Sequence, residues 1–349
     1  MKSCGVDILG MKDFQLGKFK INDKSPVVII AELACEHGGN MDAAKRLIRA
    51  AKEAGADIAK LQLHVIEEEM VPDTIKFWAG SMDEVLRRVN IGALEQHKEL
   101  KKYCEELGIM YLCTPFCMEA ADILEKVGVD AYKTGSGELT NIPMLRHLAR
   151  KGKPMVVSTG MCSLEELAET VEALKNERAD FALTHCVSEY PANYEDLNLG
   201  VIAKLKEKFD VVVGYSDHTN EVYSSIAAVA MGAKIIEKHF TIRELHGPDD
   251  MVSLDPTQFK QLVDAIRKVE KSLGSSKQVH EQEKEVRGWA HHSVVAKTDI
   301  SSGKKITQEM LTVKRPGWGV PAKFLDSFIG KTTKKPINKN EFIKWEDVA

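Results

Sequence analysis

The chain has 349 residues, of which 44% are hydrophobic and 29% are charged, and its formal net charge at pH 7 is -4. This composition is typical of a protein that buries a large core and forms one large domain plus a small one. Charges of both signs are interspersed, which argues against nucleic acid or an anionic membrane as a partner. The sequence shows neither an apolar signal segment nor an apolar run of membrane-spanning length, so we expect a cytoplasmic protein.

Short apolar runs alternate with helical patterns from residue 27 onward, which is typical of repeated βα units. One helical pattern begins with Ser163 and Glu166, which have the spacing of a capping box. Eight such units in succession favour an α/β fold of the TIM type, a (β/α)8 barrel, over an open doubly wound sheet. The predicted strands are residues 27–34, 57–64, 110–116, 131–136, 154–160, 181–188, 211–218 and 233–240.

The residue pattern of the sequence changes after residue 273. We expect a catalytic barrel over 1–273, in which a hairpin before Pro26 plugs the bottom of the barrel. A polar stretch over 274–288 predicts a linker. Residues 289–349 have short β-type runs and turn signals, so a small β-rich domain is predicted there. Because about 60 residues make a marginal independent domain, we expect this domain to dock against something.

Several cofactor classes are excluded by the motifs. The GKT at 330–332 has Leu325 where a Walker A glycine would stand, and no GxGxxG follows a predicted strand, so nucleotide binding is disfavoured. The cysteines contain no Cys-X-X-Cys pair, so neither a disulfide framework nor a zinc knuckle is predicted, and most are read as small core residues. They stand at positions 4, 35, 104, 113, 117, 162 and 186.

Polar residues gather where the predicted strands end. Active sites of (β/α)8 barrels lie at the carboxyl ends of the strands, so these residues are expected to share one site. They are Glu32, Lys60, Gln62, Thr114, Lys133, Ser136, Ser158, His185, Ser188, Ser216, Asp217, His218, Glu237 and His239.

Two histidines end the last two predicted strands, which are neighbours in a barrel. His218 and His239 are placed to share one divalent cation, and few protein ligands would leave room for water and a substrate oxygen. The alternative is a pair of ordinary polar rim residues. We favour the metal site; His185 is a further candidate ligand, although we expect it to sit lower in the barrel.

Two lysines, Lys60 and Lys133, lie in runs that are otherwise buried. A buried lysine without an anionic ligand is costly, so each needs a chemical reason. One explanation is that one of the lysines forms a Schiff base, as in class I aldolases. The other is that the two lysines bind a phosphate and a carboxylate. Nearby hydroxyl groups and the glycine-rich stretches 135–138 and 158–161 favour an anion with many oxygens.

Glu32 ends the first predicted strand and faces the same cavity. This position suits general acid–base catalysis by a carboxyl group with a raised pKa. A salt bridge to Lys60 or Lys133 explains the position equally well.

The motifs of the chain occur in a specific order and spacing. They are IAELACEHGGN, AKLQLHVIEEEM, CTPF, YKTGSGEL, VVSTGM, HCVSEYP, NYEDLNL, GYSDHT, EKHFT, GPDDMVSLDP, SVVAKTDISSGKKIT and VKRPGWG. On these motifs the sequence resembles the sialic acid synthase family, N-acetylneuraminate synthase type, over nearly its whole length. The resemblance implies condensation of phosphoenolpyruvate with an N-acylated amino sugar, typically N-acetylmannosamine. It also implies a C-terminal antifreeze-like (SAF) domain and a domain-swapped homodimer.

The resemblance also implies roles for single residues. His218 and His239 would bind the cation, Mn²⁺ with Mg²⁺ or Co²⁺ as alternatives, and Glu32 would be catalytic. Arg315 would reach the N-acyl group of the substrate from the partner subunit. Positions near the metal or the sugar are Gln62, Tyr190 and Asp249, and phosphoenolpyruvate-binding positions are Lys60, Thr114, Lys133, Ser136, Ser158, Ser188 and Ser216.

Other functions stay open at this point. A sister enzyme that makes legionaminic or pseudaminic acid would use a 6-deoxy diacetamido sugar, and GPDDMVSLDP with KRPG favours the neuraminate or legionaminic type. The segment 71–90 is expected to border the sugar. A Schiff-base aldolase and a non-catalytic binding protein whose tail recognises a ligand or ice are two further alternatives.

Overall fold

The computed structural model describes residues 13–77, 80–245 and 247–349. These residues form two compact units, one that ends at Leu273 and one that spans Gly274–Ala349. Each unit has its own apolar core. The first part of the opening segment, residues 1–12, lies outside the described residues.

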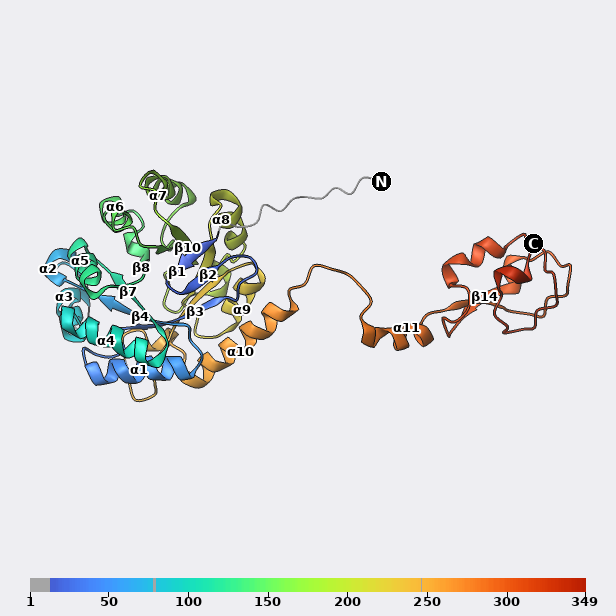
Figure 1. The fold of residues 1–349 in the computed structure, drawn as a ribbon, viewed down its shortest axis with the longest axis horizontal. Helices are drawn as coiled ribbons and strands as arrows, with labels where there is room; N and C mark the ends of the chain where they lie inside the picture. Colours follow the sequence, from blue (N-terminus) through green and yellow to red (C-terminus); the bar gives the residue numbers. More distant parts are fainter. Residues whose placement is uncertain (1–12, 78–79, 246) are drawn as a thin grey trace. The chain divides into compact units, whose positions relative to one another are not determined.

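The first unit is a barrel of eight parallel strands surrounded by helices (Figure 1). The hydrogen-bonded order is β7-β4-β3-β12-β11-β10-β9-β8, and β7 contacts β8, so the barrel is nearly closed. All eight predicted strands are confirmed, with shorter ends. They are β3 (Val28–Ala34), β4 (Ile58–Leu63), β7 (Met110–Pro115), β8 (Tyr132–Thr134), β9 (Met155–Ser158), β10 (Phe181–Cys186), β11 (Val213–Asp217) and β12 (Ile235–His239).

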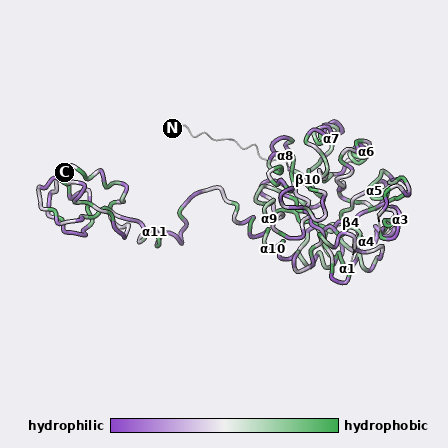
Figure 2. The backbone as a smooth tube through the Cα atoms, turned by 180° about the vertical axis from the view of Figure 1, so that it is seen from behind, coloured by the Kyte–Doolittle hydropathy of each residue, from purple (hydrophilic) through white to green (hydrophobic). Residues whose placement is uncertain are grey.

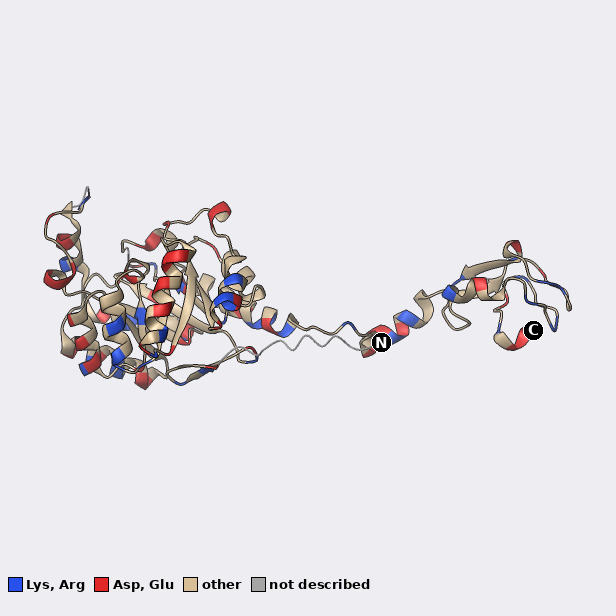
Figure 3. Cartoon of the chain, turned by 90° about the horizontal axis from the view of Figure 1, so that it is seen from above, with Lys and Arg blue, Asp and Glu red and all other residues tan. Residues whose placement is uncertain are grey.

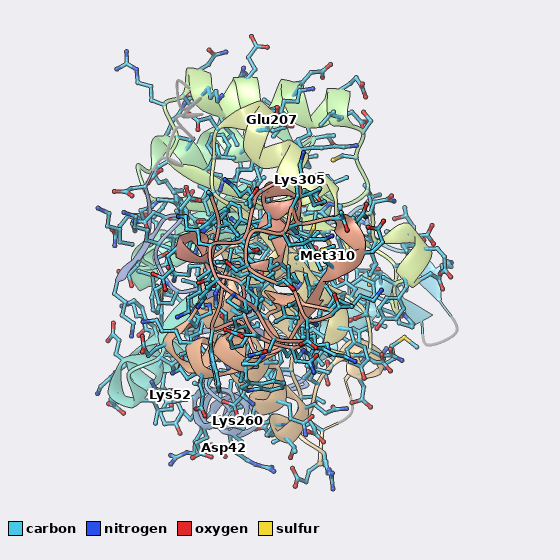
Figure 4. The ribbon with its side chains drawn as sticks, turned by 90° about the vertical axis from the view of Figure 1, so that its right-hand side faces the viewer. Asp42, Lys52, Glu207, Lys260, Lys305 and Met310 are labelled. Atoms are coloured by element: carbon cyan, nitrogen blue, oxygen red, sulfur yellow. The ribbon has the colours of Figure 1, made fainter. Side chains whose placement is uncertain are left out.

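Helices follow the strands and cover the outside of the barrel. The predicted capping box of Ser163 and Glu166 begins the helix after β9. Figure 4 places Asp42, Lys52 and Lys260 at the outer edge of this unit. The helices are α1 (Met41–Glu53), α2 (Ile66–Glu69), α3 (Met82–Val89), α4 (Leu94–Leu107), α5 (Met118–Val127), α6 (Ile142–Arg150), α7 (Leu164–Asn176), α8 (Val201–Phe209), α9 (Tyr223–Ala230) and α10 (Pro256–Ser272); a short hairpin of β5 (Lys76–Phe77) and β6 (Gly80–Ser81) lies between α2 and α3.

Side chains along each strand point alternately into the barrel and out to the helices. In β11, Val213 and Tyr215 join the outer core with the helices, whereas Val212, just before the strand, joins the inner core. Hydrophobic and hydrophilic stretches are accordingly interleaved along the chain (Figure 2). The alternation fixes which residues can reach a site inside the barrel.

A hairpin closes the bottom of the barrel. Strands β1 (Phe14–Leu16) and β2 (Phe19–Ile21) pair antiparallel. Phe14, Leu16 and Ile21 are buried against inward-facing side chains such as Ile30 and Leu112. The described hairpin thus packs against the inner core at this end of the barrel, and the active-site end of such barrels is the opposite, carboxyl end.

The second unit is small and β-rich, as predicted. Strands β13 (Ser293–Ala296) and β14 (Leu311–Lys314) pair antiparallel beside a separate core that includes Val294, Phe328 and Ile343. Within the segment predicted as a linker, a helix begins at Lys284: α11 (Lys284–Ala290).

No helix among the described residues is long and apolar enough to cross a membrane. Lys and Arg residues are interleaved with Asp and Glu residues over the helices (Figure 3). In the described part of the chain the six cysteines are free, and five of them are buried, which agrees with their reading as core residues.

The buried His97 of α4 contacts Tyr111 of β7. The Nδ1 atom of His97 lies 2.6 Å from the Tyr111 hydroxyl, and Nε2 lies 2.6 Å from the Ile91 carbonyl oxygen. A neutral ring fits both contacts, because Nε2 donates and Nδ1 accepts. Burial lowers the pKa of His97 to about 4.

This burial predicts a loss of stability in mild acid. The unfolded chain takes up a proton near the ordinary histidine pKa of about 6.5, whereas folded His97 takes it up near 4, so stability is lost as the pH falls from about 6.5 towards 4. Between about pH 7 and pH 5 this group alone lowers the free energy of unfolding by about 2 kcal/mol. Urea denaturation followed by circular dichroism measures the difference.

His97→Gln should remove that part of the loss, while the exposed control His280→Gln should keep the wild-type loss. An identical pH dependence in His97→Gln and wild type would contradict the assignment.

Candidate active site

A cavity of about 320 Å³ lies at the carboxyl ends of the barrel strands. It collects the predicted site residues except His185, Asp217, Asp249 and Arg315. Its lining is Glu32, Lys60, Gln62, Thr114, Phe116, Lys133, Gly135, Ser136, Gly137, Ser158, Met161, Cys186, Ser188, Tyr190, Ser216, His218, Glu237 and His239.

Two ammonium and two carboxylate groups form the floor of this cavity. The Lys60 Nζ atom lies 2.7 Å from Glu32 Oε2 and 3.6 Å from Glu237 Oε1, and Lys133 Nζ lies 3.7 Å from Glu237 Oε2. All four residues are at most 5% exposed. We name these four residues the charge cluster. Glu32 faces the cavity and is also paired with Lys60, so its position is compatible with both open interpretations.

The charge cluster separates the proton affinities of its two carboxyl groups. Burial raises the pKa of Glu32, and the charge of Glu237 adds to this effect against the opposing charge of Lys60. Burial would also raise the pKa of Glu237, but Lys133 and Lys60 outweigh it and hold that pKa below its ordinary value. Two carboxyl groups whose pKa values are pushed apart are suited to different roles, one as a proton carrier and one as a fixed anion.

The two lysines differ in the same way. Burial lowers the pKa of Lys133, whereas for Lys60 the carboxylates of Glu237 and Glu32 outweigh burial and raise the pKa. Lys133 Nζ also donates to the Thr134 carbonyl oxygen at 2.9 Å, and Lys60 Nζ donates to Thr114 Oγ1 at 3.1 Å. An incoming anion would therefore find both lysines already oriented.

Hydroxyl groups surround the lysines. Ser136 Oγ and Ser158 Oγ lie 2.8 Å apart, and Ser136 Oγ accepts from the backbone N–H of Gly160 at 3.1 Å. Ser216 Oγ donates to Glu237 Oε1 at 3.0 Å. Gly160 must be glycine, because an added Cβ would come within 2.6 Å of the Ser136 and Ser188 hydroxyls. These donors are close enough together to bind several oxygens of one anion.

The two histidines face each other across β11 and β12, with ring centroids 5.4 Å apart. His218 Nδ1 lies 2.7 Å from the Val187 carbonyl oxygen, and its Nε2 atom lies 2.9 Å from the Tyr190 hydroxyl. Burial and nearby cationic groups lower the pKa of His239 well below its ordinary value. Its Nδ1 atom is buried and has no hydrogen-bond partner.

Asp249 lies at the edge of this pair, on the loop after β12. Its Oδ2 atom is 3.6 Å from His239 Nδ1, and burial raises its pKa to about 6. The loop is held by buried Glu36, which accepts hydrogen bonds from the backbone N–H groups of Gly247 and Asp249 at 3.0 Å. Asp249 thus joins the predicted set, although it does not line the cavity.

Arg315 lies in the second unit. Its Nε atom donates to the Ala290 carbonyl oxygen at 2.9 Å, and its guanidinium lies 5.7 Å from the centroid of the Trp289 ring. Its role towards the substrate stays a prediction.

Three residues take a larger part in the site than the sequence indicates. Glu237 was recognised only as a polar strand end, yet it pairs with both lysines. Cys186 was read as a core residue, but its Sγ atom lines the cavity 3.7 Å from His218 Nδ1. Phe116 supplies an aromatic wall. Strand alternation carries the signal for Cys186 and Glu237, because each stands in phase with the inward-facing residues of its strand.

His185 points the other way. Its Nε2 atom lies 2.7 Å from the Leu197 carbonyl oxygen, and its ring lies 6.0 Å from that of Tyr215 on the outer side of the strands. It does not line the cavity with the other histidines, and a cavity of about 650 Å³ that it does line contains neither buried lysine.

Comparison with known proteins identifies the family. The pattern of the NeuB family matches residues 47–278, and that of the SAF domain matches residues 291–349. The chain belongs to the NeuB family. The predicted (β/α)8 barrel, the SAF domain and the expectation of an enzyme of the sialic acid synthase kind are thereby confirmed.

Individual relatives cover almost the whole chain. The N,N'-diacetyllegionaminic acid synthase of Campylobacter jejuni is 37% identical over 91% of this chain and 98% of its own. The human N-acetylneuraminate-9-phosphate synthase is 36% identical over 93% of this chain and 94% of its own. The crystal structure of the N-acetylneuraminic acid synthetase of Leptospira borgpetersenii, in complex with citrate, has a TM-score of 0.72 at 33% identity and covers 79% of this chain and 95% of that chain.

The charge cluster makes a prediction about stability. Glu237→Gln removes one carboxylate and leaves two buried ammonium groups with a single anionic partner, Glu32. Breaking a buried ion pair from one side costs about 3–5 kcal/mol, so we expect a loss of that size in the free energy of unfolding measured in urea. The exposed control Glu195→Gln should change it by less than about 0.5 kcal/mol. A Glu237→Gln protein as stable as this control would contradict the pairing.

Proposed function

We propose that the chain is a synthase that condenses phosphoenolpyruvate with N-acetylmannosamine, forming a nine-carbon 2-keto acid and releasing phosphate. The observation that carries the proposal is the pair of buried lysines in a hydroxyl-lined cavity, beside two facing histidines. Membership of the NeuB family and the names of the relatives support the same class of reaction.

Phosphoenolpyruvate fits the donors at the floor of the cavity. It carries a carboxylate and a phosphate, and Lys60 and Lys133 are two cations that burial has already freed of most of their water. We assign its binding to these lysines together with the hydroxyls of Thr114, Ser136, Ser158, Ser188 and Ser216. Held in this way, its C3 atom would face the open mouth where the second substrate enters.

The two histidines fit a divalent cation. His239 has an unpartnered, buried nitrogen and a pKa that keeps its ring neutral, and a neutral His218 would offer Nε2 as a ligand, because its Nδ1 lies 2.7 Å from the Val187 carbonyl oxygen. Among the described residues no group of three or more His, Cys, Asp or Glu side chains gathers as a ligand set, so two histidines would leave positions for water and substrate. We propose Mn²⁺, with Mg²⁺ or Co²⁺ as alternatives. A cation there would polarise the aldehyde oxygen of the sugar.

Glu32 is the proposed proton-transfer group. In the reaction, C3 of phosphoenolpyruvate bonds to the aldehyde carbon, water adds at C2, and the C2–O bond to phosphate breaks. Glu32, whose pKa is raised by burial, can take the proton of that water or return one to the leaving oxygen. Glu237, held ionised by two lysines, keeps the site electrically balanced while protons move.

The second substrate is assigned to the mouth of the cavity. Gln62 and Tyr190 line it, and Asp249 lies beside His239. We propose that Arg315 of a second subunit completes this part of the site in a domain-swapped homodimer. A monomeric mass in sedimentation would remove that role.

The choice of sugar is tested by phosphate release. Phosphoenolpyruvate with Mn²⁺ is supplied with N-acetylmannosamine, its 6-phosphate, or 2,4-diacetamido-2,4,6-trideoxymannose, with and without chelator. Release that is fastest with the first sugar and lost with chelator is the proposed result. Preference for the third sugar would keep the mechanism and make the product legionaminic acid, preference for the 6-phosphate would match the human relative's product, and release with none would refute the proposed function.

A Schiff-base aldolase is the second candidate, because burial lowers the pKa of Lys133 and so favours the neutral amine that such chemistry needs. Borohydride with pyruvate would then modify Lys133 covalently, and mass spectrometry would detect the adduct. The proposed synthase should give no adduct.

In the Glu32→Gln variant we expect phosphoenolpyruvate binding to persist while turnover falls. The amide keeps the size of the side chain but cannot carry the proton, so turnover should fall by about 100-fold or more. Phosphoenolpyruvate binding measured by calorimetry should change by less than about tenfold, since the lysines remain. Turnover close to that of the wild-type enzyme would rule out the role of Glu32.

A further inference from the structure

Four polar side chains form a continuous row that leads from the end of α2 to Glu32. Glu69 Oε2 lies 2.8 Å from His64 Nδ1, His64 Nε2 lies 3.3 Å from Gln62 Oε1, and Gln62 Nε2 lies 2.9 Å from Glu32 Oε1. We name Glu69, His64, Gln62 and Glu32 the orienting row. His64 and Glu69 do not line the cavity, and no role has been assigned to either of them above.

The directions of the hydrogen bonds follow from the ends of the orienting row. The Gln62 amide donates from Nε2 to the Glu32 carboxylate, so its Oε1 atom, an acceptor, faces His64. The two ring nitrogens of His64 bridge the Glu69 carboxyl group and this Oε1 atom. The contact of His64 with Oε1 orients the NH₂ group of Gln62 towards Glu32.

His64 is itself held rigidly. Its side chain is 5% exposed and stacks on Phe116 with ring centroids 4.3 Å apart. Its backbone is bound by the amide of Asn90, which donates to the His64 carbonyl oxygen at 2.8 Å and accepts from the His64 N–H at 3.3 Å. A ring fixed by stacking, by Glu69 and by Asn90 can fix the rotamer of the residue that it contacts.

The alternative donors to Gln62 are weak. Cys35 Sγ lies 3.8 Å from Gln62 Oε1, and a thiol is a poor donor. Without His64, the Gln62 amide could turn and present its oxygen to Glu32, which would place two acceptors against each other. Glu32 would then depend on Lys60 alone for its orientation.

We propose that Glu69 and His64 are positioning residues that hold the Gln62 amide, and through it the Glu32 carboxyl group, in the geometry needed for proton transfer. This inference rests on the proposed function for the role of Glu32. It gives Glu69, which lies just before segment 71–90, a part in positioning the proposed proton-transfer group.

Kinetics test the proposal with matched variants. His64→Phe keeps the stacking on Phe116 but removes both ring nitrogens, and Glu69→Leu removes the carboxyl group that contacts His64. Both should lower kcat by about 10–100-fold, the usual cost of losing an outer-shell partner, while the KM for phosphoenolpyruvate stays within about twofold. Glu69→Gln keeps an acceptor for His64 and should lose clearly less than Glu69→Leu. The neighbouring exposed control Glu68→Gln should match the wild-type enzyme.

A second measurement does not depend on activity. The side-chain NH₂ signals of Gln62, assigned by their loss in Gln62→Glu, should be dispersed and protected from exchange in the wild type and in Glu68→Gln. In His64→Phe and Glu69→Leu they should shift and exchange faster. Unchanged Gln62 signals in both variants, or kcat values in both within twofold of wild type, would overturn the proposal. If the wild-type protein has no synthase activity, the proposed function fails, and the Gln62 signals still decide whether the row orients this amide.

Discussion

The buried charge cluster is the constraint on which the rest of the site depends. Two ammonium and two carboxylate groups in the interior of a barrel would be very costly apart, and they are tolerable because each finds an opposite charge within 4 Å. The pairing is incomplete, however: Glu237 Oε2 accepts no hydrogen bond, and Glu32 Oε2 meets Lys60 without a well-aligned one. A cluster balanced in this way can admit an anion, since the lysines retain donors that the carboxylates do not use.

The same cluster explains how two similar carboxyl groups acquire different tasks. Glu237 lies between two cations, so its charge is stabilised and it serves as a counter-ion. Glu32 meets one cation and the charge of Glu237, so burial dominates and its proton affinity rises. The difference between the two pKa values comes from the neighbouring charges, because both side chains are buried. The orienting row acts on the group of the two that is proposed to move a proton.

Much of the fold could be predicted from the sequence because the barrel repeats one simple pattern. Each strand is apolar along its length and polar at its carboxyl end. The apolar runs therefore predict the number of strands, and their polar ends predict where the site lies. Lys60, Lys133, His218 and His239 were placed correctly because an isolated polar residue in a buried run needs a partner. Strand alternation would have carried the prediction further: it places Cys186 and Glu237 inside the barrel and His185 outside it.

Other features could not be read from the chain. The contact of Glu69 with His64 depends on how the chain turns from β4 into α2, and residues five positions apart after a strand give no signal of pairing. The buried pair of Asp217 and Lys238 illustrates the same limit. Both lie near the carboxyl ends of their strands, yet they face outward, and Lys238 Nζ lies 3.3 Å from Asp217 Oδ1. Whether Arg315 acts on the barrel of a second subunit likewise depends on assembly.

We propose that the charge cluster receives phosphoenolpyruvate. Phosphoenolpyruvate alone, without amino sugar, is titrated calorimetrically into the wild-type protein, Lys133→Met and the control Lys204→Met. We expect binding to the wild type and the control, and affinity at least about tenfold weaker in Lys133→Met, because one charge-assisted contact is lost. Equal affinity in all three proteins would contradict it.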